Sequence, residues 1–304
     1  MLVTGGLGFI GSRLCNALLD AGAHVRCVDN LSGVYADGVG PAAAPGLGSR
    51  GADVRVADVG PEHVDGMDAV IHLAGLPGVR TRRSVAELLR ANVELSERLA
   101  VAAAARGARL VFVSSSSVYG NARVLPTPEH AEPAPLNPYA ESKLAAEAAV
   151  LRAGGDAGIV RPFTVYGPGQ RPDMAFARWI GAMGRGEPAP LHAAPGAARD
   201  FTYVDDAVAG LVAALRHGRP GRAYNISGWR SVAVRSALEL LGCPELRELP
   251  ASDAEATVTW GSPVRASAEL GYAPRVGLDA GIARQLEVAS PRRLGRRRPR
   301  APAA

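Results

Sequence analysis

The 304-residue sequence predicts an α/β protein with a doubly wound parallel sheet and a smaller C-terminal lobe. Three observations support this prediction. The chain opens with a short apolar strand, a glycine-rich turn and a helix; short apolar runs then alternate with helical runs at the spacing of βαβ units; and the length suits one large domain with an added lobe. We expect residues 1–166 to form mainly a nucleotide-binding domain, residues 167–290 mainly a substrate-binding lobe interleaved with the sheet, and residues 291–304 a disordered tail.

The first strand ends at Thr4 and runs into a turn with glycines at positions 5, 8 and 11, after which a helix extends to Asp20. Glycine lets the backbone approach a pyrophosphate, which rests on the N-terminus of such a helix. A second strand, His24 to Val28, ends at Asp29, where a carboxylate meets adenosine ribose hydroxyls and repels a 2′-phosphate. The pattern predicts NAD rather than NADP, with an ordinary strand-end aspartate as the alternative.

The next elements continue the alternation. We expect a surface loop over residues 31–50, strands over residues 53–57, 69–73 and 110–113, and a long helix over residues 84–106. The apolar side of that helix is predicted to carry Leu88, Leu89, Val93, Leu99 and Val101. Four serines, residues 114–117, follow the last of these strands. Open α/β sheets bind ligands at the carboxyl ends of their strands, so position favours a binding site over a low-complexity loop.

A helix is predicted from Pro138, with Asn137 as its N-cap and proline at its first position. Tyr139 and Lys143 are then one turn apart on the same face. The ammonium is expected to favour the phenolate, which makes Tyr139 a usable proton acceptor near neutral pH. Of the 34 basic residues, Lys143 is the only lysine, which suggests a site that needs a compact charge. Chance survival of one surface lysine is the alternative.

Composition excludes several classes. The net charge is +5, but six arginines lie after residue 290 with no acid among them, so the remainder of the chain carries −1. The body therefore does not favour a nucleic-acid partner, although a contact through the tail stays open. Three widely spaced cysteines indicate free thiols, a reducing cytoplasmic location and no metal site. No apolar run is long enough to span a membrane, and no signal peptide is evident.

Taken together, these motifs resemble the extended short-chain dehydrogenase/reductase family, and within it the NAD-dependent nucleotide-sugar epimerase/dehydratase group. The resemblance reaches to about Glu287 and implies a Rossmann-type fold. The segments that carry it are Gly5 to Gly11, Asp29, Asp58, His72 to Gly75, Ser114 to Gly120, Tyr139 to Lys143, Arg161 to Pro168, Arg199 to Asp206, Tyr224 to Ser227 and Glu269 to Tyr272.

The resemblance implies three catalytic residues. Ser115 and Tyr139 would share hydrogen bonds with the sugar 4-hydroxyl, Tyr139 would take its proton while C4 passes hydride to NAD, and Lys143 would hold the nicotinamide ribose and keep the Tyr139 pKa low. The cofactor-binding residues implied in this way are Gly5, Gly8, Phe9, Ile10, Gly11, Asp29, Asn30, Asp58, Val59, Leu73, Ala74, Gly75, Asn92, Val113, Tyr139, Lys143 and Pro162.

The two positions after Ser115 separate the subgroups of this family. Dehydratases carry Asp-Glu there, whereas this chain has Ser116 and Ser117, and hydroxyls cannot replace carboxyl groups in acid/base work near pH 7. The expected reaction is therefore 4-epimerisation by transient oxidation at C4. UDP-glucuronate/UDP-galacturonate is slightly favoured over UDP-glucose/UDP-galactose. Dehydration, decarboxylation and C4 reduction are the enzymatic alternatives, and an NAD-binding regulatory or RNA-binding relative is the non-enzymatic one.

Substrate contacts are expected from Ser115, Ser116, Thr164, Arg171, Arg199 and Asn225. Arg171 would face a C6 carboxylate or only tie down a loop. Arg199 would contact the diphosphate or pair with Asp200 or Asp206, and Asn225 would line the nucleotide pocket or belong to a structural turn. The family's second diphosphate arginine is replaced here by the segment Ser252 to Glu255.

Two further expectations concern packing. The three tryptophans, Trp179, Trp229 and Trp260, are expected in the core rather than against a nucleotide. By analogy with the family, we also expect a homodimer formed through the helices over residues 84–106 and 139–151.

Overall fold

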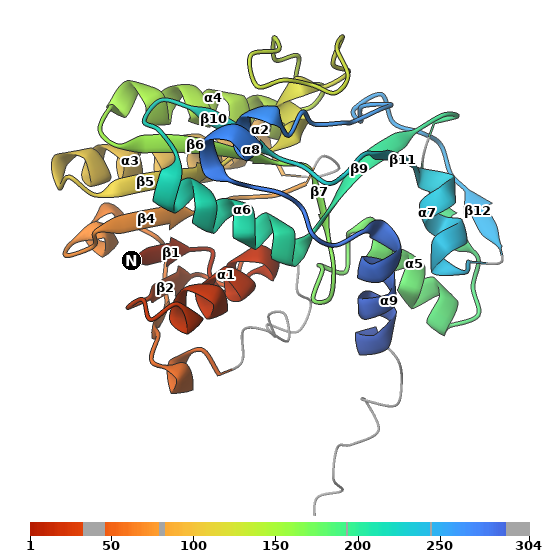
Figure 1. Ribbon diagram of the computed structural model, residues 1–304, viewed down its shortest axis with the longest axis horizontal. Coiled ribbons are helices and arrows are strands. Elements are labelled where there is room, and N and C mark those ends of the chain that lie inside the picture. Colours follow the sequence, from red (N-terminus) through yellow and green to blue (C-terminus); the bar gives the residue numbers. More distant parts are fainter. Residues whose placement is uncertain (33–45, 79–82, 193, 244, 290–304) are drawn as a thin grey trace, which may run out of the picture.

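The computed structural model describes residues 1–32, 46–78, 83–192, 194–243 and 245–289. The expected tail and most of the expected 31–50 loop lie outside these ranges. In the described chain, seven parallel strands form the central sheet in the order β10-β6-β5-β4-β1-β2-β3 (Figure 1). This order confirms the predicted doubly wound sheet. The strands are β1 (Leu2–Thr4), β2 (Arg26–Asp29), β3 (Asp53–Val56), β4 (Ala69–His72), β5 (Arg109–Val113), β6 (Ala157–Pro162) and β10 (Ala223–Ile226).

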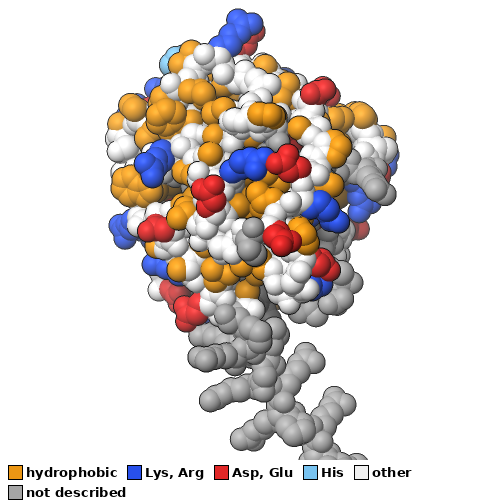
Figure 2. Space-filling model, turned by 90° about the vertical axis from the view of Figure 1, so that its right-hand side faces the viewer, with side chains coloured by type: hydrophobic (Ala, Val, Ile, Leu, Met, Phe, Trp, Pro, Cys, Tyr) orange, Lys and Arg blue, Asp and Glu red, His pale blue; other side chains and the backbone are white. Residues whose placement is uncertain are grey.

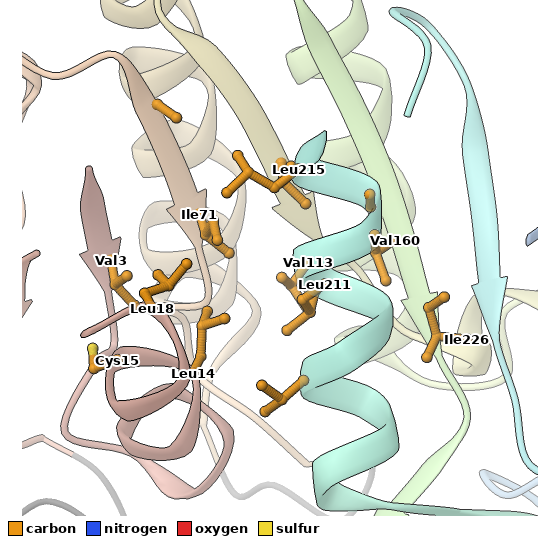
Figure 3. Packing of buried hydrophobic residues seen from close by; sticks show 14 of the residues in the cluster. Val3, Leu14, Cys15, Leu18, Ile71, Val113, Val160, Leu211, Leu215 and Ile226 are labelled. Carbon is orange, nitrogen blue, oxygen red and sulfur yellow. The ribbon is translucent and has the colours of Figure 1, made fainter. Parts of the chain in front are cut away.

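Helices cover both faces of this sheet. One face packs against α1 (Phe9–Asp20) and α6 (Val204–His217), with α8 (Val264–Leu270) beside α6. The other face packs against α3 (Leu95–Ala105) and α4 (Pro138–Ala153). Successive strand residues point to opposite faces. Val3, Ile71 and Val160 therefore meet α1 and α6 (Figure 3), whereas Leu2, Val70 and Ile159 belong to the core under α3 and α4.

The predicted long helix over residues 84–106 is present as three joined pieces: α2 (Val85–Leu88), a π-helical segment η3 (Leu89–Glu94) and α3. The wider π turn rotates the residues that follow it relative to a regular α-helix. Leu88 and Leu99 are buried as predicted, but Leu89 and Val101 are 43% and 54% exposed. Their assignment to the core-facing side was wrong.

The second half of the chain builds a smaller lobe beside the sheet, at the right of Figure 1. It contains a three-stranded sheet of β7 (Thr164–Tyr166), β9 (Ala198–Tyr203) and β11 (Ser231–Ala233), and a pair of β8 (Ala189–Leu191) and β12 (Leu246–Glu248). Its helices are α5 (Ala175–Gly184), α7 (Val234–Leu241) and α9 (Leu278–Ala289). Because α6 and β10 return to the main sheet, the lobe is interleaved with it.

An aromatic cluster forms the core of this lobe. Phe176 lies 5.0 Å from Tyr166 and 5.0 Å from Trp179, measured between ring centroids. Trp179 is thus a core residue, as expected. Trp260 is only partly buried, and Trp229 is 63% exposed, so its assignment to the core was wrong. Trp229 lies in the short connection between β10 and β11, where its side chain faces solvent.

The outer face of the lobe carries acidic and basic side chains that alternate with apolar ones (Figure 2). No single-sign patch of the kind that binds nucleic acid is visible among the described residues of that face. No helix in the described ranges is long and apolar enough to cross a membrane.

The strand order reverses between β1 and β4. From β1 the chain moves outward to β2 and β3, then returns to β4 on the other side of β1. In an open parallel sheet, this reversal leaves a crevice outside the carboxyl ends of the strands. The glycine turn after β1 and the serines after β5 both lie at that edge.

Candidate active site

A cavity of about 500 Å³ lies between the carboxyl edge of the main sheet and the smaller lobe. It brings together residues from distant parts of the chain. The predicted catalytic and substrate-contacting residues that line it are Ser115, Ser116, Tyr139, Lys143, Thr164, Arg171 and Arg199. Predicted cofactor contacts that line it are Ile10, Leu73, Gly75, Asn92, Val113 and Pro162.

Ser115 caps the short 3₁₀ turn η4 (Ser116–Tyr119). Its hydroxyl oxygen accepts hydrogen bonds from the Ser117 amide at 3.2 Å and from the Ser117 hydroxyl at 2.9 Å. Because both acceptor positions are used locally, the Ser115 proton is left to point toward another partner. The Tyr139 phenol is close enough for the Ser115 hydroxyl to act on its pKa, which it lowers.

The helix bearing Tyr139 begins as predicted. The Asn137 side chain accepts a hydrogen bond from the Ala140 amide at 2.9 Å, and Pro138 occupies the first helical position. This start places Tyr139 in the first turn, with Lys143 one turn later on the same side.

The electrostatics around Tyr139 differ from the sequence prediction. Burial raises the pKa of the Tyr139 phenol, while its hydrogen bond with Ser115 and the charge of Arg171 oppose that rise. The Lys143 ammonium instead lies 4.3 Å from the centroid of the Phe112 ring. Its pKa is lowered to about 8 by burial, with Glu147 acting in the opposite direction. Burial therefore outweighs the groups that lower the Tyr139 pKa in this structure, and the cation among those groups is Arg171 rather than Lys143.

Beneath the cavity, a buried hydrogen-bond chain runs through His72. The Ser96 hydroxyl donates to the Asn92 carbonyl at 2.6 Å, so His72 Nε2 must donate to Ser96 across 3.0 Å. His72 Nδ1 then accepts from the Thr4 hydroxyl at 2.7 Å, and Thr4 accepts from the Ala74 amide. His72 is therefore neutral, and burial lowers its pKa to about 3. The chain holds the segment after β4 in place.

The turn after β1 has the shape that a dinucleotide requires. Gly5 has φ +69°, and a Cβ there would lie 2.8 Å from the Ala74 amide nitrogen. A Cβ at Gly11 would lie 2.2 Å from the Gly5 carbonyl oxygen. The α1 N-terminus, with Gly8 as N-cap, has no capping side chain. Ile10 in its first turn lines the cavity, and the free amides of a helix N-terminus bind anions, so the segment fits the pyrophosphate of NAD.

The next strand ends carry the other predicted cofactor contacts. Asp29 accepts hydrogen bonds from the Leu7 amide at 3.0 Å and the Leu31 amide at 2.9 Å, which holds its carboxylate at the end of β2. Asn30 donates to Asp58 at 2.8 Å, and Val59 follows, half-buried. Asp29 is therefore held at the strand end where the sequence predicts a contact with ribose hydroxyls, and Asp58 lies beside it at the end of β3.

Asn92 lines the same side of the cavity and secures its wall. Its amide oxygen accepts from the Leu76 amide at 2.7 Å, and its amide nitrogen donates to the Leu76 carbonyl at 3.1 Å and to the Ser142 hydroxyl at 2.9 Å. It therefore joins the segment after β4 to helix α4.

The two predicted substrate arginines both have acidic neighbours. Arg171 pairs with Asp173 at 3.0 Å, yet its charge still acts on Tyr139. Arg199 pairs with Glu255 at 3.5 Å and also donates to the Thr257 carbonyl at 2.9 Å. The alternative salt-bridge partner predicted from the sequence for Arg199 was Asp200 or Asp206. The structure shows Glu255 as the partner. The segment that departs from the family pattern thus supplies an acid to the cavity wall.

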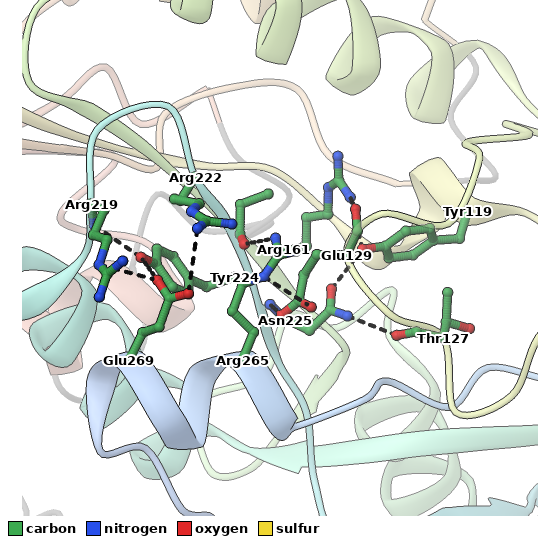
Figure 4. Close-up of polar contacts among 11 residues, drawn as sticks. Tyr119, Thr127, Glu129, Arg161, Arg219, Arg222, Tyr224, Asn225, Arg265 and Glu269 are labelled. Atoms are coloured by element: carbon green, nitrogen blue, oxygen red, sulfur yellow. Dashed lines mark hydrogen bonds and ion pairs between the residues drawn. The ribbon is translucent and has the colours of Figure 1, made fainter.

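Asn225 is not brought to the cavity. It is fully buried, accepts a hydrogen bond from the Tyr119 hydroxyl at 2.8 Å and donates to the Thr127 carbonyl at 2.9 Å (Figure 4). Because its amide oxygen and nitrogen are both bonded to protein groups, the structural reading of Asn225 holds and the substrate-contact prediction is not supported.

Sequence reasoning also missed residues of the cavity wall. Arg178 from α5 and His192 after β8 both line it, with 3.5 Å between Arg178 Nη2 and His192 Nε2. Neither belongs to a local motif, so only the packing of the smaller lobe against the sheet could reveal them.

Comparisons with known proteins agree with this geometry. A family model described as "NAD dependent epimerase/dehydratase family" matches residues 1–227. An uncharacterized UDP-glucose epimerase of Bacillus subtilis is 32% identical over 94% of this chain and 96% of its own length. A dTDP-glucose 4,6-dehydratase of Streptomyces griseus is 31% identical over 93% of this chain and 92% of its own. The UDP-glucuronic acid 4-epimerase of Bacillus cereus, crystallised with UDP-glucuronic acid and NAD, superposes with a TM-score of 0.85 at 31% identity, covering 96% of this chain and 99% of that one.

Proposed function

Since this chain belongs to the NAD-dependent epimerase/dehydratase family, we propose that it is an NAD-dependent UDP-sugar 4-epimerase acting on UDP-glucuronate and UDP-galacturonate. The observation that carries the proposal is that Ser115, Tyr139 and Lys143 line one cavity, with Lys143 one helical turn after Tyr139 and serines in the two positions that follow Ser115.

Tyr139 is the proton acceptor and donor for the sugar 4-hydroxyl in this proposal. Its burial favours the neutral phenol, whereas the Ser115 hydrogen bond and the Arg171 charge favour the phenolate. The balance lets one group take the proton in the forward direction and return it in the reverse. Lys143 would hold the nicotinamide ribose. Bound NAD supplies the group that accepts hydride from C4 and returns it.

Serines 116 and 117 favour epimerisation over dehydration. Eliminating water from the sugar requires an acid for the leaving hydroxyl and a base for the C5 proton. Among the described residues that line the cavity, the carboxylates are Asp173 and Glu255, and each is paired with an arginine. Neither lies next to Ser115 in the sequence, where the dehydratases carry their Asp-Glu pair.

Arg171 favours an acidic sugar. Arg171 lines the cavity, and its positive charge lowers the Tyr139 pKa, which supports a position near the reacting end of the sugar. A planar guanidinium can hold a carboxylate through two parallel hydrogen bonds. A C6 carboxylate bound in this way would also resist loss as carbon dioxide when C4 is oxidised.

The test is a panel of UDP-sugars analysed by chromatography and mass spectrometry with wild-type enzyme and Arg171→Ala. We expect C4 epimers without mass change, and a loss of activity in Arg171→Ala that is at least about tenfold greater with UDP-glucuronate than with UDP-glucose, the size of one lost charged hydrogen bond. Arg185→Ala is the matched control, because Arg185 pairs with Glu187 two residues later, at 2.8 Å, outside the cavity. Loss of water or carbon dioxide would exclude epimerisation, and equal losses with both sugars would exclude the carboxylate role.

We also propose that the protein is a homodimer. Helices α3 and α4 pack together on one face of the sheet. Together with α2 and η3 they expose four apolar side chains, which are 42–56% exposed: Val85, Leu89, Val101 and Leu151. A second copy of the same helices would bury them in a self-complementary interface. Light scattering should give twice the chain mass, and a monomer at micromolar concentration would contradict this.

A further inference from the structure

The mechanism above leaves one buried ion pair without a role. Glu147 and Arg161 have side chains that are 5% and 8% exposed, and they join in a two-pronged salt bridge. Arg161 Nε donates to one carboxylate oxygen at 2.9 Å, and Nη2 donates to the other at 2.6 Å. A buried pair of this kind adds little net stability, since desolvation offsets the attraction, so its presence calls for another explanation.

The pair lies directly beneath the catalytic residues. Glu147 is one helical turn after Lys143 on α4, and its charge acts on the Lys143 ammonium. Its carboxylate also accepts a hydrogen bond from the Ser114 hydroxyl, the residue before Ser115. Glu147 therefore links helix α4, which carries Tyr139 and Lys143, to the end of β5, where Ser114 and Ser115 follow.

Arg161 fixes the far side of this carboxylate. Its remaining nitrogen donates to the Tyr119 hydroxyl at 2.7 Å and to the Glu129 carbonyl at 3.1 Å (Figure 4). All three guanidinium nitrogens of Arg161 are thus hydrogen-bonded, and its positive charge partly offsets the negative charge of Glu147. Both carboxylate oxygens of Glu147 accept hydrogen bonds, from Ser114 after β5 and from Arg161 on β6. These bonds restrict the Glu147 side chain to one conformation and so fix the position of its charge relative to Lys143.

The other groups that face Lys143 cannot supply a counter-charge. The Phe112 ring from β5 lies under its ammonium, His72 from β4 is neutral, and Tyr139 on its own helix carries a phenol. Asn92 from η3 donates a hydrogen bond to Ser142, the residue before Lys143, and carries no charge. Among the described neighbours of Lys143, the anion is Glu147.

We propose that Glu147 is a positioning residue that keeps Lys143 cationic in its buried site, with Arg161 limiting how strongly it does so. This inference rests on the proposed function, because it assigns Lys143 a role as a charged group. It predicts opposite effects for the two partners. Removing the Glu147 charge makes the Lys143 ammonium easier to deprotonate, and removing the Arg161 charge makes it harder.

The composition of the chain provides a direct measurement. Lys143 is the only lysine, so protein labelled with [ε-¹³C]lysine gives one side-chain signal whose titration reports the charge of Lys143. For Glu147→Gln we expect the midpoint to fall by roughly one pH unit or more, the usual effect of losing one close opposite charge. Glu141→Gln is the matched control, since Glu141 lies on the same helix with an exposed side chain.

Glu147→Gln leaves Arg161 buried without its partner and can fail to fold, so a double variant is included. Glu147→Gln with Arg161→Met removes both charges and should lower the midpoint less than Glu147→Gln alone. Arg161→Met alone should raise it. The alkaline limit of epimerase activity should move in the same order.

The outcomes separate the inference from the proposed function. If the wild-type enzyme converts no UDP-sugar, the proposed function fails, while the labelled lysine still tests its link to Glu147. If epimerisation is present and the midpoint is unchanged in both Glu147 variants, the pair has only a structural role and the inference is overturned.

Discussion

The glycine turn after β1 gives the sharpest test of the cofactor site. In Gly11→Ala, the added methyl carbon would lie 2.2 Å from the Gly5 carbonyl oxygen and 2.8 Å from the Gly6 Cα. Ordinary non-bonded contacts lie at about 3.5–4.0 Å, so the turn or the helix start must move by roughly 1 Å. Both neighbours are backbone atoms, which cannot move aside by rotating a side chain.

The size of the effect follows from what the turn does. A shift of that size misplaces the amides at the start of α1 relative to the pyrophosphate. Losing one charge-assisted hydrogen bond costs about 1.5–3 kcal/mol, so NAD should bind roughly tenfold to a hundredfold more weakly. Stability should also fall by about 1–3 kcal/mol, the usual cost of overpacking.

Calorimetric titration with NAD and thermal unfolding measure the two effects. Gly184→Ala is the matched control, because Gly184 is also helical but a Cβ there meets nothing within 4 Å. It should leave NAD affinity unchanged and should not lower stability. A Gly11→Ala variant that folds and binds NAD with wild-type affinity would refute the assignment of this turn to the cofactor.

Two further predictions concern buried groups. Tyr139→Phe should lower kcat by about 10²–10⁴-fold, the usual contribution of a proton-transfer residue, while calorimetry shows NAD binding within a few-fold of wild type; an active Tyr139→Phe would remove Tyr139 from the catalytic role. For His72, the folded-state pKa of about 3 lies below the ordinary 6.5, so the folded protein binds fewer protons and stability is lost as the pH falls below 6.5. Urea unfolding between pH 6.5 and 5 should show that His72→Gln loses less stability than wild type, by up to about 1.4 kcal/mol per pH unit, and equal slopes would contradict a buried neutral His72.

Local features could be predicted from the sequence because they depend on neighbouring residues. The glycine spacing after β1 predicts a turn whose geometry follows from the missing side chains at Gly5 and Gly11. The Asn137-Pro138 start places Tyr139 and Lys143 on one helical face without reference to the rest of the protein. The alternation of strands and helices likewise predicts a parallel sheet, because each connection is long enough to cross it.

Predictions failed where a side chain's role depends on distant partners. Asn225 belongs to a segment that matches the family pattern, yet its amide group is hydrogen-bonded to Tyr119 and Thr127. Arg199 lines the cavity as predicted, but its salt-bridge partner is Glu255 rather than Asp200 or Asp206. The apolar character of Trp229 gave no information on whether another element covers it. Leu89 and Val101 were misassigned because each lies close in sequence to a buried residue but on another side of the helix. Leu89 is one position after Leu88, about 100° round the helix, and Val101 is two positions after Leu99, about 200° round it.

The sequence by itself determined the dinucleotide turn, the Tyr139–Lys143 spacing and the first five strands of the main sheet, since these follow from short-range backbone geometry and hydrophobic periodicity. Only the tertiary structure decided which charges act on the proposed catalytic residues. Burial raises the Tyr139 pKa and lowers that of Lys143, Arg171 arrives from the smaller lobe, and Glu147 is held by Arg161 from the neighbouring strand. Electrostatic effects depend on distance and dielectric surroundings in space, and neither is written in the spacing of residues along the chain.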